Sequence, residues 1–366
     1  MLMPSAQNLR YPSLQFEHLV RLSDSTGILQ HARWSAPDPR WGYTLDDNAR
    51  AFVVALHGYQ HTSDGELREW ARRYLAFMIY AQTDDGWFRN FADYNRRWLE
   101  SAGSPDSNGR AMWALGYGVH HAPDDGMRET AMWVFSRAWP NISRLTSPRA
   151  VASALLGCAE AHEADWKAPT MLAQIDDCAT YLTKLFDQAS QPDWQWFEHS
   201  LTYGNATLPH AMIVAGRVLG SERYLDIGRR TLNFLCDIVF EQSYLDVIGH
   251  DGWFERGGAK TPFDQQPIDA ACLVDALLVA QRVFQDPQYG TLARKALGWF
   301  YGQNRMGIAL YDARTGGCFD ALIAEGVNRN QGAESTLAHL SARLAIEMAE
   351  PEMKYVLERV PHLHQH

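Results

Sequence analysis

Cysteine is scarce in this sequence, and its pattern excludes a disulfide-stapled or zinc-finger fold. Five cysteines are scattered over 366 residues, and no two of them form a Cys-x-x-Cys pair. An odd number of dispersed cysteines is typical of buried thiols in a reducing compartment. The N-terminus also lacks the basic region and apolar stretch of a signal peptide, and no uncharged apolar run reaches membrane-spanning length. We therefore expect a cytoplasmic protein.

Basic residues are outnumbered, which limits the partners of the chain. It has 33 Lys and Arg against 43 Asp and Glu, for a formal net charge of -10. Nucleic acid and anionic membranes call for clustered Lys and Arg, so we expect neither as a partner. The sequence has no phosphate-binding glycine loop, His-Glu-x-x-His motif or nucleophile elbow, and we predict no metal and no cofactor. Residues 1–10 and the histidine-containing end 361–366 are expected to fray.

Aromatic and other apolar residues, by contrast, are plentiful. The chain is 46% hydrophobic, enough for a sizeable core, and it holds 13 tryptophans. Indole rings fill cores, but they also stack on the apolar faces of sugar rings. The excess of tryptophan therefore hints at a carbohydrate-binding groove.

Helical periodicity dominates the chain, and the expected helices come in pairs. The second helix of most pairs is rich in Ala and Gly, as close packing in an inner ring requires, whereas the first helices carry more charge and suit an outer ring. Six such pairs predict an all-α fold, an (α/α)6 toroid that forms a single domain over residues 1–366, with an open solenoid as the alternative. The expected pairs are 14–22 with 46–59, 65–82 with 106–120, 125–139 with 147–163, 171–188 with 205–219, 224–240 with 267–284, and 289–301 with 332–348.

Long connections separate the first helix from the second in several pairs. These connections span 83–105, 189–204, 242–266 and 302–331, whereas the turns that follow the second helices are short. Because the inner helices of a toroid all run the same way, the long loops meet at the end that carries the inner-helix N-termini. Functional residues concentrate on such loops, and the partial positive charge of helix N-termini favours carboxylates there.

The stretch Gly42-Tyr43-Thr44-Leu45-Asp46-Asp47-Asn48-Ala49-Arg50-Ala51 contains the strongest candidates for catalysis. One aspartate would suffice to cap the helix, so the second acid is surplus to capping. Two interacting carboxylates titrate as a pair, which can leave one of them protonated near neutral pH. We predict Asp46 and Asp47 as acid/base residues, with N-terminal capping as the alternative for either one alone. Arg50 lies on the same helix face, where it would orient a sugar or form an ion pair.

A similar motif recurs at Asp106-Ser107-Asn108-Gly109-Arg110-Ala111, again at the start of an expected helix. Asp106 is therefore a further catalytic candidate and Arg110 a substrate-binding one, with a helix cap and an ion pair four residues apart as the structural alternatives. Glu334 is in the first turn of the last inner helix, which neighbours the first one when the ring closes. Glycoside cleavage needs two carboxyl groups, about 5 Å apart for retention or roughly 6.5–9.5 Å for inversion. We predict Asp47 and Glu334 as this pair.

The long loops supply the remaining candidates for substrate binding. Each combines acidic or polar residues with aromatic ones, and tryptophans in polar loops favour a groove over core packing. Histidines beside the fourth inner helix, His199 and His210, would transfer protons in an alternative, epimerase-type reaction. The predicted binding residues from these loops and the adjoining helix start are Trp87, Trp196, Glu198, His199, Trp253, Glu255 and Asp269.

Three motifs carry a resemblance to known proteins. They are GYTLDDNARA, DSNGRAMWALG and NQGAESTLAHL, and with the six helix pairs they resemble six-hairpin, (α/α)6 carbohydrate-active proteins. They are similar in particular to a bacterial toroid domain that often lies C-terminal to a group 1 glycosyltransferase domain. The resemblance implies a sugar ligand and a separately encoded glycosyltransferase as a partner, since this chain contains no such domain.

Three functions follow from these expectations. The leading hypothesis is a glycoside hydrolase of a short oligosaccharide, with one carboxyl group as general acid and another as general base. The second is a sugar epimerase or isomerase of the N-acylglucosamine 2-epimerase type. The third is a non-catalytic carbohydrate-binding module that serves a glycosyltransferase.

Overall fold

The computed structural model describes residues 11–164 and 170–349, so the two ends expected to fray, 1–10 and 361–366, lie outside the described part. The described residues form twelve α-helices, at the places where the periodicity predicts them. They are α1 (Glu17–Leu22), α2 (Leu45–Thr62), α3 (Gly65–Ala81), α4 (Pro105–His121), α5 (Asp125–Ala138), α6 (Pro148–Glu163), α7 (Met171–Ala189), α8 (Thr207–Leu219), α9 (Glu222–Val239), α10 (Pro267–Phe284), α11 (Pro287–Gly298) and α12 (Ala333–Ala349).

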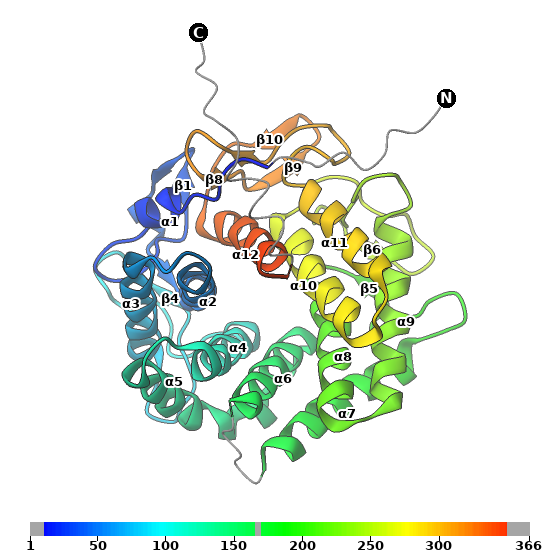
Figure 1. Ribbon diagram of the computed structural model, residues 1–366, viewed down its shortest axis with the longest axis horizontal. Coiled ribbons are helices and arrows are strands. Elements are labelled where there is room, and N and C mark those ends of the chain that lie inside the picture. The colour runs from blue at the N-terminus through cyan, green and yellow to red at the C-terminus, as the bar shows by residue number, and fades with distance from the viewer. Residues whose placement is uncertain (1–10, 165–169, 350–366) are drawn as a thin grey trace.

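The helices form two concentric rings (Figure 1). Each even-numbered helix packs against the next even-numbered one, and α12 returns to pack against α2, so the inner ring is closed. The odd-numbered helices cover it from outside. This arrangement confirms the (α/α)6 toroid and excludes the open solenoid. No helix in the described ranges is long and apolar enough to cross a membrane.

Small residues allow the inner helices to approach closely. A β-carbon on Gly116 of α4 would overlap the carbonyl oxygen of Gly157 on α6, and one on Gly109 would overlap that of Ala150. The two backbones are therefore in direct contact, as the Ala and Gly content of these helices predicts. The core between the rings consists of larger side chains, including the fully buried Phe52 and Phe135.

The outer helix that each inner helix packs against differs from the one expected from the sequence. The expected pairs join each inner helix to the outer helix that precedes it in the chain. Among the outer helices, each inner helix from α2 to α10 packs most extensively on the one that follows it, as α2 does on α3 and α4 on α5. The reason is connection length: a turn of a few residues holds two helices side by side, whereas a long loop lets them separate.

The long loops contain five small two-stranded antiparallel sheets. In one sheet, β3 in the loop between α1 and α2 pairs with β4 in the loop between α3 and α4. In another, β5 in the loop between α7 and α8 pairs with β6 in the loop between α9 and α10. These pairings hold the loops over one end of the toroid. The strands are β1 (Ala32–Arg33), β2 (Ala36–Pro37), β3 (Tyr43–Thr44), β4 (Phe91–Ala92), β5 (Ser200–Leu201), β6 (Phe254–Glu255), β7 (Tyr311–Asp312), β8 (Gly317–Cys318), β9 (Ala321–Ile323) and β10 (Gly326–Asn328).

Candidate active site

A cavity of about 550 Å³ opens at the end of the toroid that carries the inner-helix N-termini. First-turn residues of α2, α4 and α12 line it together with loop residues. A second cavity of about 60 Å³ shares Arg50, Arg110 and Ser153 with the first, so it continues it toward the middle of the ring. Four of the predicted catalytic residues line the larger cavity, namely Asp46, Asp47, Asp106 and Glu334.

Thr44, and not an aspartate, caps the helix on which the acidic pair lies. Its hydroxyl oxygen accepts a hydrogen bond from the backbone N–H of Asp47 at 3.0 Å and donates one to the Asp47 carboxylate at 2.6 Å. The capping alternative for Asp46 is therefore wrong, because the Thr44 hydroxyl already caps this helix. Both carboxyl groups lie in the cavity lining instead.

The guanidinium of Arg50 contacts three carboxylates. Its Nη1 lies 2.7 Å from Asp46 and 3.4 Å from Asp47, and its Nη2 lies 2.9 Å from Glu334. The contact between Arg50 and Glu334 joins the first inner helix to the last, as the ring closure predicts. Arg110 approaches from α4 and contacts the other oxygen of Asp46 at 2.5 Å.

The two adjacent aspartates differ in their protonation. Burial raises the pKa of both, but the charges of Arg110 and Arg50 outweigh it at Asp46 and hold that pKa below its usual value. At Asp47 burial prevails over the more distant Arg50, and the negative charges of Asp46 and Glu334 add to it, so the pKa rises to about 7. Adjacent carboxyl groups with opposite shifts are the arrangement that acid/base chemistry requires.

Asp106 differs from Asp46 although the two occupy equivalent places. It does not pair with Arg110, which reaches Asp46 instead, so the expected pair within α4 is wrong. Its Oδ2 accepts a hydrogen bond from the hydroxyl of Tyr203, and its buried Oδ1 has no hydrogen-bond partner among the described residues. A buried carboxylate oxygen without a partner in the cavity lining suits a sugar hydroxyl.

Arg149 of α6 organises the loop that carries Tyr203. It contacts Glu198 at 2.9 Å, donates to the carbonyl oxygen of Tyr203 at 2.5 Å, and lies over the Tyr203 ring at 4.8 Å. Glu198, predicted to bind substrate, is thus occupied by an ion pair and is absent from the cavity lining. Its contribution is to fix Arg149, and through it Tyr203, at the cavity wall.

The loop before α10 contributes a histidine and a tryptophan. His250 Nε2 lies 2.8 Å from Asp269, whose second oxygen accepts from the backbone N–H of Gly204 at 2.7 Å. Trp253 lines the cavity as predicted, with its ring centre 4.4 Å from that of His250. Asp269 is buried behind the cavity surface. It orients its neighbours instead of touching the cavity itself.

Four further predicted binding residues lie away from the cavity, in addition to Glu198 and Asp269. Trp87 is buried and donates to the carbonyl oxygen of Gly103, and Trp196 is fully buried against the Phe197 and Phe234 rings. The groove prediction is wrong for both, because the loops fold back and use these indoles as their own core. His199 and Glu255 are exposed outside the cavity lining.

Several lining residues were not predicted from the sequence. His31, Arg149, Tyr203, His250 and Asp320 come from segments without a repeated motif. Three of them, Tyr203, His250 and Asp320, lie in the long loops that combine acidic or polar residues with aromatic ones. That composition is the sequence feature that could have indicated them. Trp41 is exposed, and its ring lies edge-on to that of His31 in the cavity lining.

The closed double ring and the carboxylate-lined cavity at its loop end place the protein in the (α/α)6 toroid class. No protein-family model matches the chain, and no curated protein is similar enough to match it. Solved structures do match. A sugar epimerase from a ruminal bacterium is 13% identical, with a TM-score of 0.72 over 94% of this chain and 97% of the other.

Two further structures extend the comparison. Cellobiose 2-epimerase from Spirochaeta thermophila is 14% identical, with a TM-score of 0.69 over 93% of each chain. An α-1,6-mannanase, GH76A of Salegentibacter sp., is 12% identical, with a TM-score of 0.62 over 91% of this chain and 96% of the other. At these identities the likeness concerns the fold.

Proposed function

We propose that the protein is a glycoside hydrolase that acts on a short oligosaccharide. The observation that carries the proposal is the group of three carboxylates around Arg50, in which Asp47 has a pKa of about 7 and Asp46 is held ionised. Glycoside cleavage needs one carboxyl group that still holds its proton and one that is ionised. Asp47 protonates the leaving oxygen, and Glu334 activates a water molecule.

The environment of each group suits its role. Asp47 is buried, and with its pKa at about 7 a large share of it keeps the proton at neutral pH, whereas the Glu334 side chain is 44% exposed and open to water. Both contact the same guanidinium, so their separation is set by one planar group. Asp46, clamped by two arginines, keeps a negative charge beside Asp47 that further raises the pKa of the acid.

A second observation supports the acidic pair. The Salegentibacter mannanase was captured with α-1,6-mannotetrose as an inactive variant in which two consecutive aspartates are replaced by alanine. This chain has four pairs of consecutive aspartates, and of these Asp46-Asp47 lines the cavity. α-1,6-Linked mannosides are therefore substrates to test early.

The test is turnover by single carboxamide variants. In Asp47→Asn and Glu334→Gln we expect oligosaccharide hydrolysis to fall by roughly 10²–10⁴-fold, the usual contribution of a general acid or base. Release of reducing sugar from a panel of α-mannosides and β-glucosides measures it. Glu255→Gln, on an exposed residue outside the cavity, is the matched control and should retain full activity. Wild-type turnover by both cavity variants would contradict the assignment.

An epimerase is the second candidate, and His250 is the observation that favours it. Its imidazole lines the cavity and is oriented by Asp269, and His31 faces the same cavity. The two histidines expected for this reaction do not fit: His199 is outside the cavity, and burial lowers the pKa of His210 to about 4. Deuterium uptake from solvent into an unhydrolysed sugar, abolished in His250→Asn, would support epimerisation over hydrolysis.

The motif resemblance also supports a partner, a separately encoded glycosyltransferase. If the chain were a binding module for such an enzyme, it would bind glycans without turnover and raise the activity of the transferase when mixed with it.

We also propose a cytoplasmic location, which rests on the five cysteines, all of them free. Fractionation of cells that express the protein tests the location.

A further inference from the structure

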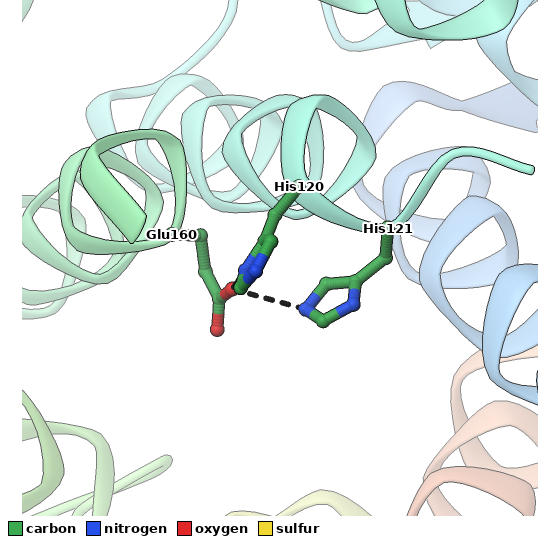
Figure 2. Close-up of side chains that lie close together, drawn as sticks. All are labelled: His120, His121 and Glu160. Carbon is green, nitrogen blue, oxygen red and sulfur yellow. Dashed lines mark hydrogen bonds and ion pairs between the residues drawn. The ribbon is translucent and has the colours of Figure 1, made fainter. Parts of the chain in front are cut away.

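A cluster of two histidines and a glutamate lies at the end of the toroid opposite the cavity. His120 and His121 are the last residues of α4, and Glu160 is in the last turn of α6. One side-chain atom of each lies within 4.8 Å of the other two. Glu160 Oε2 is 2.7 Å from His120 Nδ1 and 3.1 Å from His121 Nε2, and Figure 2 shows both rings beside that carboxylate.

We propose that these three residues bind a divalent transition-metal ion such as Zn²⁺. Imidazole nitrogens and a carboxylate oxygen are the donors that such ions prefer, at about 2.0–2.2 Å from the metal. Tetrahedral coordination at these lengths separates the donors by about 3.4 Å. The contacts of 2.7 and 3.1 Å are somewhat shorter than this value, and the two imidazole nitrogens lie within 4.8 Å of each other, so side-chain rotations would bring the three donors to it. Three protein donors leave a coordination position open to water or a small anion.

The backbone beneath the cluster is held firmly. Gly116 and Gly157 bring α4 and α6 into direct backbone contact one turn before the three donors. The Tyr117 ring stacks on the His121 ring, with centres 4.1 Å apart and planes 27° apart. A site whose donors are already in place loses little conformational entropy on binding, which favours affinity.

The charge around the cluster suits a cation. The C-terminal ends of α4 and α6 both carry partial negative charge at this point. Of the charged side chains near His120, Glu163 favours a cation through its negative charge, and Arg128 disfavours one through its positive charge.

The metal site is separate from the proposed active site. None of its three residues lines either cavity of the toroid centre. A bound ion would tie the end of α4 to that of α6, and so its expected effect is on thermal stability. The inference does not rest on the hydrolase assignment.

Cobalt binding tests the proposal. The full chain is used with His362, His364 and His366 changed to Gln, because the three alternating histidines at its end would bind metal in any case. We expect Co²⁺ to give visible absorption bands at one equivalent, Zn²⁺ to displace them, and Zn²⁺ to raise Tm by a few degrees. In His121→Gln and Glu160→Gln the affinity should fall by roughly 100-fold, since even the loss of outer contacts to a ligand costs 10–100-fold.

His162→Gln is the matched control, since His162 lies on the same helix end but outside the cluster. It should leave the spectrum and the Tm shift unchanged. Metal-free Tm values show whether each variant folds. The proposal is overturned if the tail-substituted chain gives no bands, if the cluster variants bind as tightly as their parent, or if the control loses affinity equally, as an adventitious ion on surface histidines would.

Discussion

Asp46 and Asp47 are neighbours in the chain, yet their surroundings give them opposite pKa shifts. Asp46 contacts two guanidiniums at 2.5 and 2.7 Å, so opposite charge compensates its burial. Asp47 is at 3.4 Å from Arg50, and most of its burial remains uncompensated. A difference of less than 1 Å in ion-pair distance thus separates the proposed acid from the ionised carboxylate beside it.

The pKa of about 7 at Asp47 predicts a pH dependence of stability. The folded-state pKa lies above the unfolded value of about 3.9, so the favourable contribution is complete below pH 4 and is lost as pH rises through 7. Asp47→Asn does not titrate, so the variant does not lose stability in this way. The difference in free energy of unfolding, variant minus wild type, should therefore increase by about 3 kcal/mol from pH 5 to pH 8, since two pKa units correspond to about 2.7 kcal/mol. Urea unfolding at the two pH values measures it.

The same titration bears on the rate if Asp47 is the general acid. Hydrolysis then requires its protonated form, and kcat/KM should decline as pH rises above about 7. A stability difference that stays constant from pH 5 to pH 8 would show that Asp47 does not titrate in this range.

At the scale of elements, the repeated Asn explains why the two motifs look alike. Asn48 accepts from the backbone N–H of Ile28 and donates to the Thr44 carbonyl, and Asn108 makes the equivalent bonds to Phe88 and Ser104. Each amide thus fastens the preceding loop to the start of its helix. The asparagines of the motif are structural, whereas its aspartates and arginines have diverged in their contacts.

The backbone contact between α4 and α6 gives a prediction about packing. Gly116→Ala places a methyl group against the Gly157 carbonyl, and this overpacking should destabilise the protein by about 1–3 kcal/mol. Gly65→Ala is the matched control, since its methyl group meets nothing within 4 Å at an exposed helix start. It should be neutral or stabilising by up to about 1 kcal/mol. Thermal unfolding of the two variants compares them, and equal Tm values would contradict the close approach.

At the scale of the whole molecule, two contacts between polar side chains join the last inner helix to the first. Arg50 of α2 contacts Glu334 at the cavity end, and His61 of α2 contacts Glu347 at the other end, 2.9 Å away. Glu347 also pairs with the buried Arg343 at 2.5 Å. Ring closure therefore places α12 against α2 along its length and brings Glu334 to the site.

Glu347→Gln tests the buried ion pair near the end of α12 that lies away from the cavity. It leaves the buried guanidinium of Arg343 without a counter-charge, which typically costs about 3–5 kcal/mol. Chemical denaturation should show a loss of this size. Glu69→Gln, in an exposed pair with Arg72, should change stability by less than about 0.5 kcal/mol. Similar small effects in both variants would mean that the buried Arg343–Glu347 pair adds little to stability.

The sequence by itself determined the helices and the ring, because both depend on apolar periodicity and on small residues at fixed spacing. It also determined that Asp46, Asp47, Asp106 and Glu334 lie at inner-helix N-termini, where the motifs place them. That residues 1–366 form one domain stays a prediction.

Only the tertiary structure decided which side chains meet. Arg110 pairs across to α2 and not within α4, and Trp87 and Trp196 enter the core because their loops fold back on themselves. The histidine cluster likewise joins residues forty positions apart. Such contacts depend on loop paths and on helix-to-helix distances, which periodicity does not encode, and they alone separate the two pKa values of the acidic pair.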